Sequence, residues 1–302
     1  QIFETLLSIF VGEEIKISRT EHSKYDRLMA QKNPLRILVA EDNLINQKVV
    51  LNMLEKLGYR ADVAANGLEV VQIFGTSTVH GPMYEVILMD LQMPDMDGLE
   101  ATRILRQKLS ASQQPWIIAV TANAMKGDRE LCLEAGMNDY ISKPIEIRDL
   151  IAALNRAAGR QMPGPEPEAP SEKAASLAPA KAAEPLLFDA AELERHTDPS
   201  MIPMLAEIFI EDAAAHIKNC KKTFENEDWA TLCRSAHSLK SASATLGGMA
   251  LSETARELES LAREAQNTPP SAENRELVLQ IIEKLQRYYD GLRAVLIEKY
   301  PF

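Results

Sequence analysis

Short apolar runs alternate with longer segments of helical spacing through the first half of the chain. Apolar runs without polar alternation are typical of parallel strands that are buried on both faces. The amphipathic segments between them predict helices, and Gly58 and Gly136 stand where two of these helices end. The pattern predicts an α/β doubly wound five-stranded parallel sheet with helices on both faces. The expected strands lie near 35–40, 60–65, 84–90, 116–121 and 138–142, and the expected helices near 44–57, 67–75, 98–109, 125–135 and 146–157.

From about Asp189 onward, only the helical spacing remains. Apolar side chains recur there every three or four residues in four segments, which is the pattern of helices with one buried face. Paired glycines and paired prolines separate these segments, and two of the expected helices lie near 228–246 and 250–265. Four amphipathic helices with short connections predict an all-α helical bundle.

The composition between the two halves changes abruptly. Residues 159–186 contain six prolines among Ala, Glu, Ser and Lys, which is typical of a linker. We therefore expect the strand–helix domain at 34–158 and the bundle at 187–300. Residues 1–33 fit neither part, and their opening segment repeats the pattern of the last expected helix of the strand–helix domain. This favours the remnant of a preceding copy of that domain and a linker, and a free-standing amphipathic helix is the alternative.

Charge and cysteine content limit the classes of protein that need to be considered. The formal net charge of −11, with no basic stripe, argues against direct nucleic-acid binding. The three cysteines are odd in number and lack the spacing of a metal site, which favours a reducing compartment. No apolar stretch approaches the length of a membrane span, and the chain starts without the pattern of a secretory leader. We expect a cytoplasmic fragment, with any membrane anchor confined to missing N-terminal regions of a longer protein.

Charged and hydroxyl side chains follow four of the five expected strands, at the point where each strand ends. In strand order they are Glu41 with Asp42, Asp90, Thr121 and Lys143. Because the carboxyl ends of parallel strands meet at one edge, these side chains should converge on one crevice. A single acid there would be an ordinary solvated strand end, but two carboxylates about 4 Å apart repel by roughly 4 kcal/mol at an effective dielectric near 20. The cluster predicts either protonation of one acid or a bound cation, and its oxygen ligands suit Mg²⁺.

Asp90 is the best candidate nucleophile because it ends the expected central strand. Its attack on a phosphoryl donor would give an acyl phosphate, and Lys143 would supply a compensating positive charge. Thr121 offers a hydroxyl to a phosphoryl oxygen, which could draw it inward on modification. Tyr140, in the fifth expected strand, is the aromatic side chain that we expect to move with Thr121. Together these groups predict a site that holds a phosphoryl group on Asp90.

These residues resemble the receiver domain of two-component signalling over about residues 34–158. The matching segments are Leu38-Val39-Ala40-Glu41-Asp42-Asn43, the run from Met89 to Gly98, Thr121-Ala122 and Lys143-Pro144. The resemblance implies a flavodoxin-like fold that accepts a phosphoryl group on Asp90. The rival is an aspartate-nucleophile phosphatase of the haloacid type. That enzyme needs a second acid two residues after the nucleophile, where this chain has Gln92.

The resemblance also implies a ligand set and a switch. The implied Mg²⁺ ligands are Asp42, Glu41, Asp90 and the backbone carbonyl of Gln92. The implied switch residues are Thr121 and Tyr140.

One of the five histidines lies in a distinctive segment of the expected bundle, Ala236-His237-Ser238-Leu239-Lys240-Ser241-Ala242. The buried stripe that we expect on this helix comprises Leu232, Ala236, Leu239, Ser243 and Leu246. His237 projects off that stripe, so we expect it on an exposed face together with Lys240 and small residues. An imidazole beside one cation on such a face suits docking against another protein's acidic crevice. His237 could then be the nucleophile while Lys240 binds the phosphoryl oxygens.

This segment, followed by Gly247, resembles the histidine phosphotransfer (HPt) domain, which the match places at about 188–298. The resemblance implies a helical bundle that is phosphorylated on His237. The family usually has a glycine after the lysine, whereas this chain has Ser241, which is still small enough for a close approach.

A receiver followed by an HPt domain resembles the C-terminal part of a hybrid sensor histidine kinase. It implies a phosphorelay in which a kinase histidine phosphorylates Asp90, the group passes to His237, and a downstream response regulator receives it. The fragment has no glycine-rich nucleotide boxes, so we do not expect it to bind ATP. The alternative is that the receiver mainly docks on the kinase core and gates it. The relay requires His237 for output, whereas the gating hypothesis does not.

Overall fold

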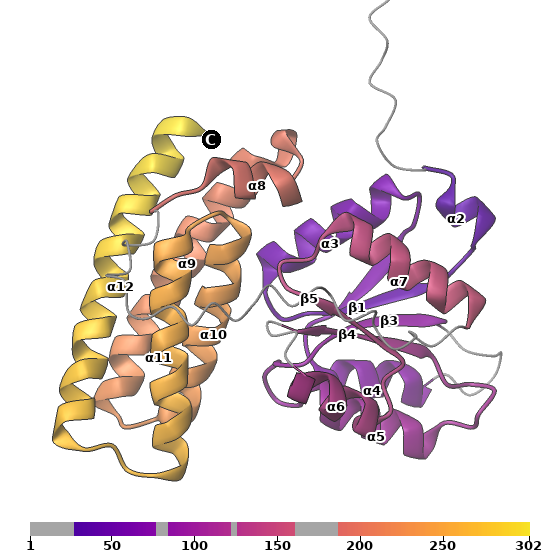
Figure 1. Cartoon of the computed structure of the whole chain (residues 1–302), viewed down its shortest axis with the longest axis horizontal. Coiled ribbons are helices and arrows are strands. Elements are labelled where there is room, and N and C mark those ends of the chain that lie inside the picture. The colour runs from indigo at the N-terminus through magenta and orange to yellow at the C-terminus, as the bar shows by residue number, and fades with distance from the viewer. Residues whose placement is uncertain (1–26, 77–83, 122–125, 161–186) are drawn as a thin grey trace, which may run out of the picture.

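The computed structural model describes residues 27–76, 84–121, 126–160 and 187–302, which form a strand–helix domain and a helical bundle beside it (Figure 1). The helical segment expected at the start of the chain and nearly all of the linker expected at 159–186 lie outside the described residues. Among the described residues, no helix combines the length and the apolar composition that crossing a bilayer requires.

The strand–helix domain contains one parallel sheet of five strands in the order β2-β1-β3-β4-β5. β1, β3 and β4 are buried along their whole length, which explains why they are continuous apolar runs in the sequence. This arrangement confirms the doubly wound α/β fold and places β3 at the centre of the sheet. The strands are β1 Ile37–Ala40, β2 Ala61–Ala64, β3 Val86–Asp90, β4 Trp116–Thr121 and β5 Asp139–Ser142.

Helices cover both faces of this sheet, with α3 and α7 on one face and α4, α5 and α6 on the other (Figure 1). Their bounds are α3 Leu44–Lys56, α4 Gly67–Thr76, α5 Gly98–Lys108, α6 Lys126–Ala135 and α7 Ile147–Gly159. A short helix, α2 Met29–Lys32, precedes the first strand. Met29 is buried in the same apolar core as β1 and α3, and the backbone N–H of Ala30 donates to Leu57 O. Part of the segment that the pattern placed outside the domain thus packs against it.

The C-terminal half is a bundle of four long helices, which confirms the expected all-α part of the fold (Figure 1). The stripe expected on the histidine-bearing helix, from Leu232 to Leu246, is buried as expected. Phe209 of the first long helix is among the largest fully buried side chains of the described residues. The elements are α8 Ala190–His196, the 3-10 helix η1 Pro199–Met201, α9 Ile202–Glu225, α10 Trp229–Thr245, α11 Met249–Asn267 and α12 Ala272–Lys299.

The bundle docks on the strand–helix domain through α9 and α10, which contact α3. One cluster of buried apolar side chains extends from the α3 and α7 side of the sheet into the bundle. Polar contacts add to it. Lys56 Nζ lies 3.1 Å from Asp198 Oδ2, and Asn43 Nδ2 donates to Asp212 Oδ2 at 3.4 Å. The docked bundle therefore faces the carboxyl ends of β1, β3, β4 and β5.

The loop after β3 is held in place by a close backbone approach at Gly98. The backbone N–H of Gly98 donates to Leu91 O at 3.1 Å. A Cβ atom added to Gly98 would lie 2.2 Å from the carbonyl oxygen of Asp90 and 2.9 Å from Met89 Cγ. Since a backbone oxygen cannot move away as a flexible side chain can, a larger residue must displace the end of β3.

We expect Gly98→Ala to lower the free energy of unfolding by about 1–3 kcal/mol because the added methyl group overpacks this loop. Urea denaturation followed by circular dichroism measures the change. Gly75→Ala is the matched control, since a Cβ atom there meets nothing within 4 Å. That helical substitution should be neutral or stabilising by up to about 1 kcal/mol. Equal effects of the two substitutions would contradict this account of Gly98.

Candidate functional site

Three carboxylates meet where β1 and β3 end. The two strands pair with Ala40 opposite Met89, so the next residues, Glu41 and Asp90, emerge side by side from the sheet. Asp42 completes the group, and ligand oxygens of all three side chains lie within 4.8 Å of one another. Glu41 and Asp90 are buried, with 4% and 2% of their surface exposed, and Asp42 is half-buried. The structure thus brings together the three acids that the sequence singled out.

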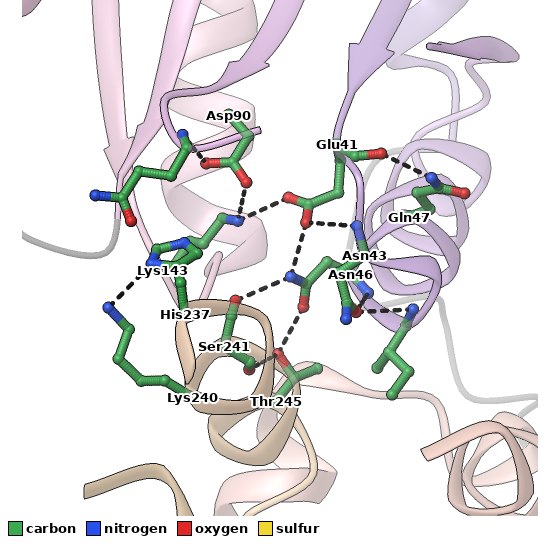
Figure 2. A network of polar contacts seen from close by, with 12 residues as sticks. Glu41, Asn43, Asn46, Gln47, Asp90, Lys143, His237, Lys240, Ser241 and Thr245 are labelled. Atoms are coloured by element: carbon green, nitrogen blue, oxygen red, sulfur yellow. Dashed lines mark hydrogen bonds and ion pairs between the residues drawn. The ribbon is translucent and has the colours of Figure 1, made fainter. Parts of the chain in front are cut away.

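Lys143 neutralises this cluster from the end of β5. Its Nζ atom lies 2.7 Å from Glu41 Oε2 and 2.7 Å from Asp90 Oδ2 (Figure 2). Burial disfavours the charged ammonium, but the ion pairs with Asp90 and Glu41 outweigh it and raise the pKa of Lys143. One buried cation therefore bridges two buried carboxylates, which reduces their mutual repulsion.

The neighbouring acids hold their protons more tightly than free aspartates. Burial raises the pKa of Asp90 to about 7, with Lys143 opposing the shift and Glu41 adding to it. Burial, followed by the charge of Glu41, raises the pKa of Asp42 to about 6. With three acids and one lysine, the pocket carries surplus negative charge when fully ionised. An all-oxygen donor set of this charge fits a hard divalent cation.

Thr121 and Tyr140 take different positions around this cluster. Thr121 is buried at the end of β4, and its carbonyl accepts from the backbone N–H of Lys143 at 2.6 Å. Tyr140 packs half-buried with the core on the α4, α5 and α6 side of the sheet, where the Arg129 guanidinium lies 5.6 Å from its ring centroid. Thr121 thus lies at the strand-end edge, whereas the ring of Tyr140 lies on a neighbouring face of the domain.

Gln92, two residues after Asp90, extends from the pocket toward the bundle. Its backbone N–H donates to Asp90 Oδ1 at 3.2 Å. With its amide turned so that the oxygen accepts from Arg263 Nη2 at 2.9 Å, its nitrogen contacts the His237 ring at Nδ1, lies 3.2 Å from Nε2 and lies 3.3 Å from Glu259 Oε1. The loop that carries Asp90 is therefore in contact with the histidine of the bundle.

His237 is buried, which corrects the expectation that it lies on an exposed face. Only 7% of its surface is exposed, because α11 covers one side of the ring and the docked strand–helix domain covers another. Figure 2 shows the imidazole beside Lys143 and directed at the pocket that contains Asp90. Burial, followed by the charges of Lys240 and Lys143, lowers the pKa of His237 despite the opposing effect of Glu259. The ring is therefore neutral near pH 7.

Glu259 of α11 contacts this ring and was not anticipated from the sequence. Its Oε1 atom lies 3.1 Å from His237 Nδ1, and its Oε2 atom lies 2.6 Å from Lys240 Nζ. Arg263 Nη2 donates to Oε1 at 2.7 Å. Burial acts against ionisation, but the hydrogen bond with His237 and the nearby cations lower the pKa of Glu259 to about 2. The ionised carboxylate can accept a hydrogen bond from Nδ1–H. In that tautomer of the neutral ring, the free electron pair is on Nε2, which is then the nucleophilic nitrogen.

Lys240 is farther from the imidazole than from this carboxylate. Its Nζ atom is 3.4 Å from His237 Nδ1 and pairs with Glu259. Glu259 and Arg263 are one helical turn apart, and a glutamate–arginine pair among the apolar positions of α11 is the sequence signal that could have identified them.

Asn46 of α3 is the second residue that the sequence analysis missed. It is 7% exposed and joins the acidic pocket to α10. Its Nδ2 atom donates to Glu41 Oε1 at 2.9 Å and to Ser241 Oγ at 2.9 Å, while its Oδ1 atom accepts from Thr245 Oγ1 at 3.0 Å (Figure 2). A polar residue facing the core side of a helix, five residues after Glu41, was the available signal.

Comparison with known proteins identifies both parts of the chain. The family model of the response regulator receiver domain matches residues 37–155, and the family model of the Hpt domain matches residues 204–293. A histidine protein kinase of Candida albicans is 46% identical over 133 residues, which is 42% of this chain and 5% of that protein. The hybrid signal transduction protein dokA of Dictyostelium discoideum is 50% identical over 119 residues, which is 39% of this chain and 7% of that protein.

Among solved structures, the chain is similar to the receiver domain of a sensor histidine kinase from Pseudomonas aeruginosa PAO1, whose active-site cleft contains a coordinated magnesium ion. The identity is 43%, the match covers 41% of this chain and 98% of the other, and the TM-score is 0.37. The chain thus spans a small fraction of the length of the curated relatives that it matches, 5% and 7% for the two named above.

We expect the affinity of the acidic pocket for a divalent cation to fall as the pH falls. Asp90 and Asp42, whose pKa values are raised to about 7 and about 6, take up protons in this range and compete with the cation. Titration calorimetry with Mg²⁺ should show affinity at least about tenfold lower at pH 5.5 than at pH 8. Asp42→Asn should weaken binding at both pH values, whereas Glu100→Gln, an exposed acid on α5, should not. A pH-independent affinity would contradict this prediction.

A second prediction follows from the contact between Glu259 and His237. Glu259→Gln removes the negative charge that favours the imidazolium form, so the pKa of His237 should fall further below its ordinary value. Titration of the His237 ring resonances by NMR measures this shift. Glu253→Gln serves as the control, since Glu253 is on the same helix but pairs with Arg256 at the surface. If both variants left the His237 titration unchanged, the carboxylate of Glu259 would not control the imidazole.

Proposed function

We propose that this chain, which carries a receiver domain followed by an Hpt domain and is a phosphorelay module of a two-component system, passes a phosphoryl group from Asp90 to His237 within the same chain. The observation that supports this proposal best is the docked arrangement of the two domains. Gln92, in the loop after Asp90, contacts the His237 ring, and Lys143 lies between the two candidate phosphoryl carriers. This arrangement supports a unimolecular step between the proposed donor and acceptor.

The first step loads the receiver domain. An oxygen of the ionised Asp90 carboxylate attacks the phosphorus of a phosphohistidine, a P–O bond forms, and the P–N bond to the donor imidazole breaks. Asp90 then carries an acyl phosphate. Lys143, which pairs with Asp90 Oδ2 before the reaction, can pair with a phosphoryl oxygen afterwards. Thr121 at the end of β4 is the hydroxyl that we propose as a further ligand of the phosphoryl group.

The second step discharges Asp90 onto the bundle. His237 Nε2 attacks the phosphorus, a P–N bond forms, and the acyl P–O bond breaks to return the Asp90 carboxylate to Lys143. The attacking ring keeps its Nδ1 proton and becomes positively charged. Glu259, 3.1 Å from Nδ1, stabilises that charge, and Lys240, which pairs with Glu259, is the cation that we propose to bind a phosphoryl oxygen.

We propose that the pocket binds Mg²⁺ through Glu41, Asp42, Asp90 and the backbone carbonyl of Gln92. When bound, this ion would neutralise charge on the phosphoryl oxygens. The three carboxylates with ligand oxygens within 4.8 Å support the assignment, as does the absence of nitrogen or sulfur ligands from this cluster of described residues. Lys143 already compensates part of the negative charge of the three carboxylates. A weakly bound, exchangeable ion is therefore enough to neutralise the remainder.

Onward transfer requires the two domains to separate. His237 is buried in the docked arrangement, so a response regulator can reach it only after the receiver domain leaves. The interface is suited to reversible contact because a partly open cleft of about 190 Å³, lined in part by Val49, Val50 and Ala244, remains between the two domains. Incomplete packing of this kind forfeits dispersion contacts and keeps docking weak.

For the complete protein, we propose a hybrid histidine kinase of which this chain is one part. The similarity to proteins named as histidine kinases and as hybrid signal transduction proteins supports this proposal. The partners would be a histidine kinase core as phosphoryl donor and the receiver domain of a response regulator as acceptor.

We expect Asp90→Asn to abolish phosphoryl loading, because the amide is not a nucleophile at this site. His237→Gln should leave Asp90 phosphorylated but prevent transfer to the bundle. Incubation with acetyl phosphate and Mg²⁺, followed by base treatment, separates the two products, since an acyl phosphate hydrolyses in base and a phosphohistidine survives it.

A second histidine of the bundle provides the control. His216→Gln, in α9, removes a half-buried histidine that pairs with Asp212 and should leave both products unchanged. If the His237→Gln chain still accumulated base-stable phosphate, or the Asp90→Asn chain still loaded at the native rate, the proposed relay would be wrong.

A further inference from the structure

We infer that Asn46, Ser241 and Thr245 form a polar lock that fixes the register of docking and selects the bundle that this receiver domain accepts. The consequence for phosphoryl transfer rests on the proposed function. The docking itself does not, and it can be measured separately. The kind of partner that this lock fits is a helix with two hydroxyl side chains one turn apart, four and eight residues after the reactive histidine.

The hydrogen-bond chemistry fixes the orientation of the Asn46 amide. An ionised carboxylate accepts but cannot donate, so the Asn46 atom 2.9 Å from Glu41 Oε1 must be the nitrogen. The same nitrogen donates to Ser241 Oγ, and the remaining oxygen accepts from Thr245 Oγ1 at 3.0 Å. Both ends of one amide are thus engaged by α10, and neither contact can be exchanged for the other.

The spacing of the contacting residues along α10 fixes how this helix is aligned with α3. His237, Ser241 and Thr245 follow one another at intervals of four residues and lie along one line of the helix. Only the placement that aligns Ser241 and Thr245 with Asn46 brings His237 to the pocket of Asp90. A slip by one helical turn, about 5.4 Å, would carry the imidazole away from the carboxylate and leave Asn46 with at most one of its two hydroxyl partners.

Because the three residues are buried, the lock discriminates between bundles as well as stabilising the docked arrangement. Asn46, Ser241 and Thr245 are 7%, 8% and 7% exposed, so water has little access to them in the docked arrangement. A bundle with an alanine or a valine at either position would leave an amide atom of Asn46 buried without that partner, and unsatisfied buried polar groups are costly. The receiver domain would therefore disfavour helices that lack the two hydroxyls.

Asn46 also links docking to the acidic pocket. Its nitrogen is shared between Glu41, which binds Lys143, and Ser241 of the bundle (Figure 2). A change in how Glu41 is held alters the position of this amide. Asn46 is thus a positioning residue that acts through Glu41 on one side and α10 on the other.

The test uses the whole chain with two bundle-side variants, Ser241→Ala and Thr245→Val, that remove one hydroxyl each. We expect each to lower the rate of base-stable phosphohistidine formation after acetyl phosphate loading by about three- to tenfold, the effect of one lost hydrogen bond. Small-angle X-ray scattering should show a larger radius of gyration for both. Thr254→Val is the matched control, since Thr254 is a buried threonine on α11 that donates to Ala250 O inside the bundle.

A double-mutant cycle with Asn46→Ala distinguishes the lock from general loosening of α10. If the lock exists, Ser241→Ala and Thr245→Val have no further effect on the radius of gyration in the Asn46→Ala chain. Fully additive effects, or native scattering and transfer for both single variants, would overturn the inference. A native chain that is compact in solution but never forms phosphohistidine would instead contradict the proposed function and leave the lock intact.

Discussion

The ion pairs of Lys143 are the interaction on which the rest of this structure depends. Two carboxylates buried side by side repel each other, and the sheet brings Glu41 and Asp90 together wherever β1 and β3 pair in this register. A single ammonium that contacts both at 2.7 Å makes that register tolerable. Because Lys143 comes from the end of β5, the pocket exists only when the outer strand has joined the sheet.

The consequences of this arrangement extend beyond the pocket. Glu41 is held by Lys143 on one side and by Asn46 on the other, and Asn46 contacts two hydroxyls of the bundle. A continuous path of hydrogen bonds and ion pairs thus runs from Asp90 to α10. Whatever displaces Lys143 from Glu41 or Asp90, such as a phosphoryl group or a cation, acts on the same path that holds the domains together.

The histidine of the bundle illustrates a compromise between reactivity and access. Burial keeps His237 neutral, and Glu259 at Nδ1 directs the free electron pair to Nε2. The same burial closes the ring to any other partner while the domains are docked. A cleft of about 190 Å³ left between the domains resolves the conflict, because incompletely packed docking can be repeatedly made and broken.

Local patterns along the chain are sufficient to predict the fold of each half and most of the residues that gather at the strand ends. Short apolar runs that alternate with helical segments predict buried parallel strands, and an acid or a lysine directly after such a strand emerges at the common edge of the sheet. Local pattern and topology are sufficient for this prediction. Glu41, Asp42, Asp90, Thr121 and Lys143 therefore lie at the carboxyl edge of the sheet, as expected. It also identified the buried stripe of α10, whose helical period is a local property.

The surroundings of His237 and the contact between the two halves depend on residues that are far apart in the chain. From the sequence, the imidazole lies off the buried stripe and should be exposed. In the structure, α11 and the receiver domain cover it, because burial depends on neighbours that are distant in the chain. Glu259 and Asn46 escaped notice for the same reason. Their positions on the helices gave a signal of burial, but the partner of each is defined only when α11 packs beside α10 and α3 packs against the bundle.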